Sequence, residues 1–162
     1  MDFRKKILTA ESLPAWRASL RVGRKKLVVT NGCFDILHLG HVTYLQTARN
    51  LGDALLVGVN GDAAVRGLKG EGRPLNNETD RAAVLAALEC VDGVFIFPEV
   101  RATNFLRLAA PDIYANGGDY TVETLNAEER EAVQSAGARI EIMPFVKGKS
   151  TTGLLEKIVQ LG

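Results

Sequence analysis

His38 and His41 are the only histidines in the chain, and they stand three positions apart with Gly40 between them. Side chains three positions apart on a helix lie on one face, so both rings should face the same ligand if a helix begins here. The first free N–H groups of such a helix carry positive partial charge and attract an anion. Two imidazoles beside a helix N-terminus are therefore suited to stabilising the charge that builds on a phosphate during phosphoryl-type transfer.

The same pair of histidines has other interpretations. Most His-x-x-His pairs are structural, and a pair can also form half of a zinc site, which Asp35 could join. A nicotinamide-binding turn would need three glycines, but this segment has only Gly32 and Gly40, at the wrong spacing. We favour the phosphate site, because no acidic or thiolate cluster stands nearby in the sequence and a glycine stands between the rings.

A glycine-rich stretch, residues 67–77, carries Lys69 and Arg73. Its glycines and proline predict a loop that moves. Two cations on such a loop suit a basic flap that closes over a triphosphate. The alternative is ordinary solvated surface charge, which is the fate of most Lys and Arg side chains.

Three hydroxyl residues, Ser150, Thr151 and Thr152, stand at the start of an apolar-periodic segment near the C-terminus. A hydroxyl residue at this place is a normal helix N-cap, and capping alone would account for it. Lys147 and Lys149 precede the hydroxyls. Cations and hydroxyls together predict a second helix N-terminus that binds anions, suited to the β- and γ-phosphates.

Two further candidates stand at the borders of predicted elements. Arg81 falls at a helix start, where a cation opposes the helix dipole, so it needs an anionic ligand or a carboxylate such as Glu78 or Asp80. Paired glycines at positions 117–118 follow a predicted strand and leave the backbone open to a base or ribose. Asp119 would then bind the ribose, the sugar substrate or a metal, or would simply cap a turn.

These candidates need a scaffold that gathers them, and the hydrophobic periodicity predicts one. Apolar strands alternate with helices, which requires that both faces of the sheet are covered and favours parallel strands with right-handed crossovers. The predicted fold class is therefore α/β, a doubly wound parallel sheet of Rossmann-like type, with its ligand site at the carboxyl ends of the strands. The predicted strands are residues 27–30, 55–60, 94–97, 113–114 and 140–143, and the predicted helices are residues 12–20, 41–50, 80–89, 104–109, 128–135 and 151–159.

Length and composition limit the classes of function. The 162 residues suit a single domain over residues 1–162, with residues 1–24 as an N-terminal helical extension. A net charge of +1 creates no broad field, so we expect neither a nucleic acid nor a membrane as partner. The N-terminus lacks the apolar run of a signal peptide, and Cys33 and Cys90 form no CxxC pattern. We therefore expect a cytoplasmic protein with free thiols.

The segment Gly32-Cys33-Phe34-Asp35, followed by His38-Leu39-Gly40-His41, resembles the G-x-F-D…H-x-G-H signature of the cytidylyltransferase-like nucleotidyltransferases. Within that superfamily the chain is similar to the D-glycero-β-D-manno-heptose 1-phosphate adenylyltransferases, over about residues 6–158. The segments that carry this narrower likeness are Val59-Asn60-Gly61-Asp62, Leu68-Lys69-Gly70 with Arg73-Pro74, Arg81, Gly117-Gly118-Asp119-Tyr120 and Ser150-Thr151-Thr152. The chain departs from that family at Asn116, where a lysine commonly precedes the glycines.

The resemblance implies an enzyme that moves AMP from ATP onto a heptose 1-phosphate, giving pyrophosphate and the ADP-heptose used in cell-surface glycan assembly. It also implies Mg²⁺ as cofactor without a direct protein ligand, a homodimer, and a separate sugar kinase. The implied catalytic residues are His38, His41 and Lys69. The implied nucleotide-binding residues are Asn31, Gly32, Cys33, Phe34, Gly40, Arg81, Gly117, Asp119, Lys149, Ser150, Thr151 and Thr152. The implied substrate-binding residues are Asp35, Asp62, Arg73 and Tyr120.

Three alternatives stay open at the level of sequence. The first is a cytidylyltransferase that acts on glycerol 3-phosphate or a related polyol phosphate, since a related family has an uncharged residue at the position of Asn116. The second is a non-catalytic nucleotide-binding protein, because Asn116 removes one cation from the expected site. The third is a zinc-binding interaction domain built on the two histidines.

Overall fold

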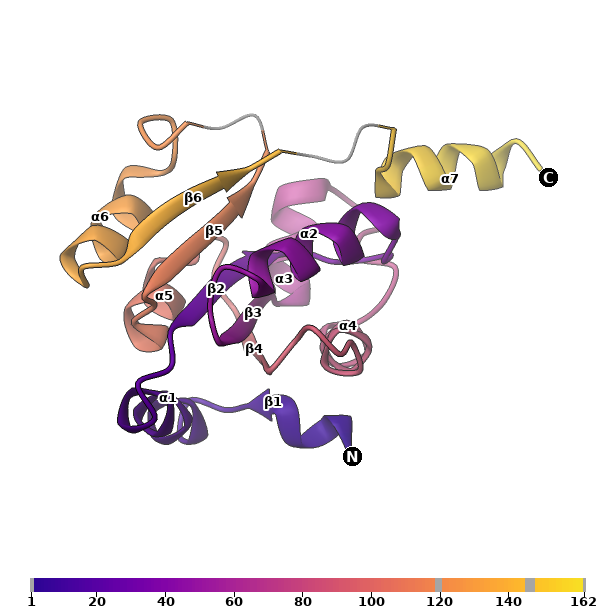
Figure 1. Cartoon of the computed structure of the whole chain (residues 1–162). Coiled ribbons are helices and arrows are strands. Elements are labelled where there is room, and N and C mark those ends of the chain that lie inside the picture. The colour runs from indigo at the N-terminus through magenta and orange to yellow at the C-terminus, as the bar shows by residue number, and fades with distance from the viewer. Residues whose placement is uncertain (1, 119–120, 145–147, 162) are drawn as a thin grey trace.

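The computed structural model describes residues 2–118, 121–144 and 148–161. Six parallel strands form one sheet in the order β1-β4-β3-β2-β5-β6 (Figure 1). The strands are β1 (Ile7–Leu8), β2 (Leu27–Gly32), β3 (Ala54–Asn60), β4 (Gly93–Phe97), β5 (Ile113–Gly117) and β6 (Arg139–Met143). The 3₁₀ helix η1 (Phe3–Lys6) and the helices α1 (Ser12–Val22), α2 (Leu39–Arg49), α3 (Asp62–Lys69), α4 (Glu78–Ala86), α5 (Thr103–Ala109), α6 (Ala127–Ser135) and α7 (Thr151–Val159) connect or flank them.

Helices cover both faces of the sheet, because successive strand residues point to opposite faces and both faces are apolar. Val28 and Leu55 pack in the core beneath α2 and α4. Their sequence neighbours Val29 and Leu56 pack in a second core with side chains of α1, α5 and α6. Each fully buried Val or Leu contributes about 1.5–3 kcal/mol of hydrophobic stabilisation. The predicted α/β, doubly wound parallel sheet is confirmed.

Strand β2 lies at the point where the strand order reverses. The chain runs from β2 to β3 and β4 on one side, and then crosses to β5 and β6 on the other side. A doubly wound sheet binds its ligands at the carboxyl ends of the strands beside such a reversal. The start of α2, which carries both histidines, and the end of β5 therefore lie at the same edge of the sheet.

Two elements differ from the sequence prediction. The N-terminal region is more than a helical extension, since Ile7 and Leu8 form an edge strand paired with Val94 and Phe95. Residues 62–69 form α3, so Lys69 ends a helix and the loop begins at Gly70. A single interior glycine such as Gly67 destabilises a helix by only about 1 kcal/mol, so α3 can form in spite of it.

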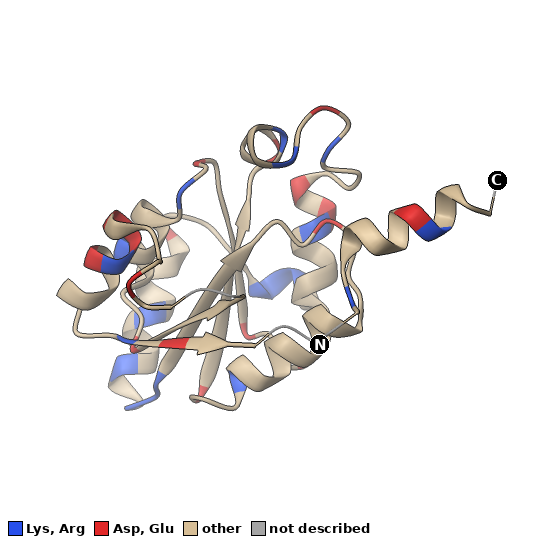
Figure 2. Cartoon of the chain, turned by 90° about the horizontal axis from the view of Figure 1, so that it is seen from above, with Lys and Arg blue, Asp and Glu red and all other residues tan. Residues whose placement is uncertain are grey.

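The last helix, α7, stands apart from the layers. Figure 1 shows it extending away from the sheet, and none of its residues is buried. Figure 2 shows acidic and basic residues interspersed over the described helices and loops. Among the described residues, no helix combines the length and the apolar character needed to cross a bilayer.

Candidate active site

The two histidine rings stack on each other at the start of α2. His38 is the N-cap residue, with extended backbone, and His41 lies in the first helical turn. Their ring centroids are 3.9 Å apart and the ring planes differ by 27°. Phe34 contacts the His41 ring edge-on, at a centroid distance of 5.4 Å. Both imidazoles therefore lie on one face at the carboxyl end of β2, as the spacing predicts.

Gly40 lets the C-terminal turn approach this pair. A Cβ at position 40 would lie 2.9 Å from His38 Cε1 and Nδ1, and 3.1 Å from the Cβ of Lys149. The Thr151 hydroxyl donates a hydrogen bond to the Ile36 carbonyl at 3.2 Å. The space beside Gly40 is thus filled by atoms of His38 and Lys149. The glycine joins two segments that are more than a hundred residues apart in the sequence.

Burial keeps the imidazoles neutral. It lowers the pKa of His41 to about 4, with His38 as a further cause. Burial also lowers the pKa of His38, and the nearby Lys149 ammonium adds to that effect. Nδ1 of each ring is buried and has no hydrogen-bond partner among the described residues. Two neutral rings with unpaired nitrogens can respond to an anion by hydrogen bonding or by taking up a proton.

Asp35 joins the loop after β2 to residues 73–76, and its predicted role in substrate binding stays a prediction. Its carboxylate is buried and accepts hydrogen bonds from Arg73 Nε at 2.7 Å and from the amides of Leu75 and Asn76, each at 2.9 Å. Burial alone would raise the pKa of Asp35, but these amide bonds and the Arg73 guanidinium hold it below its ordinary value. Its oxygens are engaged by protein donors, so it is poorly placed to bind a sugar or to complete a zinc site.

Arg81 is likewise bonded within the scaffold, and its predicted contact with nucleotide stays a prediction. It is 2% exposed. Its Nε donates to the Asn76 carbonyl, Nη1 to the Cys33 carbonyl, and Nη2 to the Asn60 carbonyl and to Asp62. The carboxylate that offsets its place near the start of α4 is thus Asp62, 2.7 Å away, and not Glu78 or Asp80. The guanidinium is thus buried and engaged by three carbonyls and one carboxylate.

Cations gather around the loop after β2. Burial raises the pKa of the Cys33 thiol, while the positive charges of Lys69, Arg81 and Arg73 act in the opposite direction. Lys69 is exposed at the end of α3, and Arg73 is held by Asp35. Lys69 is therefore available to an anionic ligand near Cys33, whereas Arg73 is already tied to a carboxylate.

Two tyrosine side chains, Tyr44 and Tyr114, contact residues of β2 and β5. The Tyr114 hydroxyl donates to Asn31 Oδ1 at 2.8 Å and accepts from Asn116 Nδ2 at 3.3 Å. Gly117 belongs to β5, and a Cβ there would lie 3.0 Å from the Tyr44 ring. Gly117 is thus needed for packing, which the sequence analysis did not foresee. The sequence predictions for Asp119, Tyr120 and Lys147 concern residues that lie outside the described part of the chain.

The remaining predicted nucleotide-binding residues lie in the loop after β2 and at the start of α7. Phe34 has a left-handed backbone (φ 47°), and the residue as a whole is 7% exposed. Gly32 is required beneath it, because a Cβ there would lie 3.0 Å from the Phe34 ring. Ser150 caps α7 by accepting from the Gly153 amide at 3.0 Å, and Thr152 is exposed in the first turn.

Sequence reasoning missed the roles of Glu78, Tyr44 and Tyr114. Glu78 Oε2 accepts from the Asp62 amide at 2.7 Å and so caps α3. No local sequence signal reveals such a bond, because its two partners are sixteen positions apart.

Within residues 2–118, 121–144 and 148–161, no group of three or more His, Cys, Asp or Glu side chains is arranged to hold a metal ion.

The cytidylyltransferase-like family model matches residues 29–154, which include both histidines and the C-terminal turn. The chain belongs to the cytidylyltransferase-like family. The bifunctional protein HldE of Citrifermentans bemidjiense is 53% identical over 135 residues, which are 83% of this chain and 27% of that protein. HldE of Geotalea uraniireducens is 50% identical over 153 residues, covering 94% of this chain and 31% of that protein. The chain thus spans less than a third of the length of either relative.

Solved structures agree with this assignment. A lipopolysaccharide core biosynthesis protein from Thermoplasma volcanium aligns with a TM-score of 0.62 and 29% identity, covering 77% of this chain and 99% of that one. A pantoate-beta-alanine ligase from Francisella tularensis, with a TM-score of 0.58 and 15% identity over 95% of this chain and 78% of that one, shares the fold. The predicted family and enzyme class, a nucleotidyltransferase, are confirmed at the level of the family.

Proposed function

We propose that the chain transfers AMP from ATP to D-glycero-β-D-manno-heptose 1-phosphate and releases pyrophosphate. The stacked His38–His41 pair beside Lys149, at the strand-order reversal, is the observation that carries the reaction class. Relatives named HldE and the lipopolysaccharide core protein support the nucleotide and the sugar, together with the motif resemblance. The expected separate kinase and the homodimer stay predictions, since the chain spans only part of relatives that are called bifunctional.

In the proposed reaction a phosphate oxygen of the acceptor attacks the α-phosphorus of ATP. A new P–O bond forms, the bond from the α-phosphorus to the bridging oxygen breaks, and pyrophosphate leaves with the electron pair. His38 and His41 donate hydrogen bonds to the α-phosphate as charge builds on it, aided by the N-terminus of α2. Lys149 and the N-terminus of α7 hold the β- and γ-phosphates. Lys69 approaches from the end of α3.

Mg²⁺ is part of the proposal as a companion of the triphosphate. Mg²⁺ commonly keeps several waters and binds through substrate phosphates and one or two carboxylates. The nearest acid in the signature, Asp35, is engaged by Arg73 and two amides, so the described site offers the ion little besides substrate oxygens. The ion would neutralise charge on the departing pyrophosphate.

A cytidylyltransferase that uses glycerol 3-phosphate is the second candidate. The uncharged Asn116, hydrogen-bonded to Tyr114, favours it over an adenylyltransferase with a lysine at this position. Pyrophosphate release should be measured for ATP and CTP, each with heptose 1-phosphate and with glycerol 3-phosphate. Turnover only with CTP and glycerol 3-phosphate would replace our assignment. Nucleotide binding without pyrophosphate in any combination would indicate a non-catalytic protein.

The same assay tests the histidines. His38→Ala should lower kcat by a factor on the order of 10² to 10³, the usual effect of losing one preorganised donor. Gln46→Ala is a matched control, because Gln46 is exposed on the same helix and bonds only to the nearby Asn50 among the described contacts. A normal rate for His38→Ala would remove this ring from the mechanism.

A further inference from the structure

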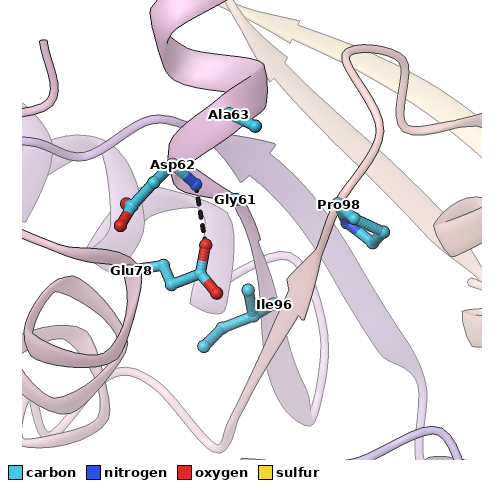
Figure 3. A pocket seen from close by; sticks show the side chains of 6 residues that line it. All are labelled: Gly61, Asp62, Ala63, Glu78, Ile96 and Pro98. Atoms are coloured by element: carbon cyan, nitrogen blue, oxygen red, sulfur yellow. Dashed lines mark hydrogen bonds between the residues drawn. The ribbon is translucent and has the colours of Figure 1, made fainter.

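A pocket of about 230 Å³ opens at the carboxyl ends of β3 and β4 (Figure 3). It is lined by Gly61, Asp62 and Ala63 at the start of α3, Glu78 at the start of α4, and Ile96 and Pro98 at the end of β4. None of the motifs discussed above uses this pocket as a whole. It lies on the edge of the sheet where an α/β protein of this type binds its ligands.

The pocket combines one free acceptor with an apolar wall. One Glu78 oxygen accepts from the Asp62 amide, and Figure 3 shows the other directed toward Ile96 and the pocket. The Asp62 carboxylate points away, toward its partner Arg81. Gly61 keeps the space open, because a Cβ there would lie 3.1 Å from Glu78 Oε2 and 3.3 Å from the Cα of Pro98.

One guanidinium joins this pocket to the histidine loop. Arg81 Nη2 bonds to Asp62 at 2.7 Å and Nη1 bonds to the Cys33 carbonyl at 2.6 Å. The pocket wall and the loop after β2 are therefore neighbours across a single buried side chain. Arg81 thus contacts both the pocket wall at Asp62 and the segment that precedes His38.

We infer that this pocket binds the hydroxyl-bearing end of the acceptor, away from its phosphate; the inference rests on the proposed function. Hydroxyl groups donate well to a carboxylate, and the aliphatic face of a polyol packs on Ile96 and Pro98. The Glu78 carboxylate repels a phosphate, whereas Lys69, Lys149 and the histidines attract one. This charge difference orients the acceptor, with its phosphate at the α-phosphorus of ATP and its carbon chain beneath α3.

Two variants test the inference. Glu78→Gln keeps an oxygen for the Asp62 amide but removes the charge, and should raise the KM for heptose 1-phosphate about tenfold while the KM for ATP stays unchanged. Ala63→Trp fills the mouth of the pocket from an exposed helical position and should have the same selective effect. Ala87→Trp, an exposed alanine at the other end of α4, is the matched control.

A binding measurement separates this inference from the proposed function. ADP-heptose should bind Glu78→Gln and Ala63→Trp about tenfold more weakly than it binds the natural chain, while the affinity for ADP stays the same. If both variants bind ADP-heptose normally and keep their KM for the sugar, the pocket assignment is wrong although the enzyme is an adenylyltransferase. If the natural chain neither binds ADP-heptose nor releases pyrophosphate from ATP and heptose 1-phosphate, the proposed function itself is wrong.

Discussion

Residues 70–77 and the turn at residues 148–150 both lie beside the loop that carries the histidines, but the protein holds them very differently. The first segment is fixed by Asp35 and Arg81, which together bind Arg73, Leu75 and Asn76. The turn is held through the Thr151 hydroxyl bond and the Ser150 cap among the described contacts. One flank of the site is thus preorganised by buried charge, and the other depends on what binds there.

Asp35→Ala should produce the largest effect. It would leave the Arg73 guanidinium and the amides of Leu75 and Asn76 without an acceptor, and removing one partner of a buried pair costs about 3–5 kcal/mol. Urea denaturation should show this loss. Asp53→Ala is the control, because Asp53 is exposed and accepts from a single amide, that of Lys26. Equal midpoints for the two variants would mean that residues 70–77 are not held as we describe.

Arg81→Lys should come second. A lysine carries a point charge in place of the planar fork that bonds to three carbonyls and a carboxylate, so we expect a loss of about 2 kcal/mol in the free energy of unfolding. The rate of pyrophosphate release should fall as well, because Cys33 and Asn60 would lose their common donor. Full stability together with a full rate would show that the guanidinium bonds contribute nothing to the site.

Lys149→Ala should change electrostatics and not stability. Removing the cation should raise the pKa of His38, while the pKa of His41 stays near 4 because burial is its main cause. With only two histidines in the chain, a proton NMR titration should resolve both rings. Lys157→Ala, an exposed lysine in the last turn of α7, is the control. An unmoved His38 pKa would place Lys149 away from the ring in solution.

The low pKa of His41 also makes the stability of the protein depend on pH. The unfolded ring titrates near 6.5 and the folded ring near 4, so the unfolded state binds more protons between these values. The contribution of the neutral ring to stability is complete above pH 6.5 and is lost as the pH falls toward 4. His41→Gln should flatten this part of a stability profile, measured by urea denaturation across that range.

Ser150→Ala should have the smallest effect. Loss of an N-cap costs about 1 kcal/mol, and here it should be confined to α7, which buries no residue. Hydrogen exchange at the Gly153 amide should therefore accelerate while the global unfolding midpoint stays constant. A shift of the whole unfolding curve would mean that α7 is bound more firmly to the body of the protein than its exposure indicates.

Much of the fold could be predicted from the sequence, because long apolar runs leave few options for a chain of this size. The two-residue strand β1 gives no periodic signal, and α3 was missed since its glycine-rich end resembles a loop. Element type was therefore secure wherever a run was long and buried on both faces of the sheet.

The site was predicted less evenly, for a physical reason. His38 and His41 lie together as their spacing predicts, because both stand at the start of one helix. The turn at Ser150 lies near them through a contact between residues 115 positions apart, which spacing cannot predict. The same signature could not say whether Asp35 and Arg81 bind a ligand or the backbone. Both tasks need a charged side chain at a fixed place, and the partners of these two residues are mostly main-chain groups more than fifteen positions away or on other elements.

The backbone at Gly70 and Gly72 has open space around it, next to the residues that Asp35 anchors. Both glycines have positive φ, and nothing lies within 4 Å of a Cβ built on either. Natural length variation, or an inserted tag, should be absorbed there because such exposed loop tips tolerate insertion. Shortening the chain between Arg73 and Asn76 would instead displace partners of the Asp35 carboxylate in the loop after β2, so members of this family should differ in length before that stretch and not within it.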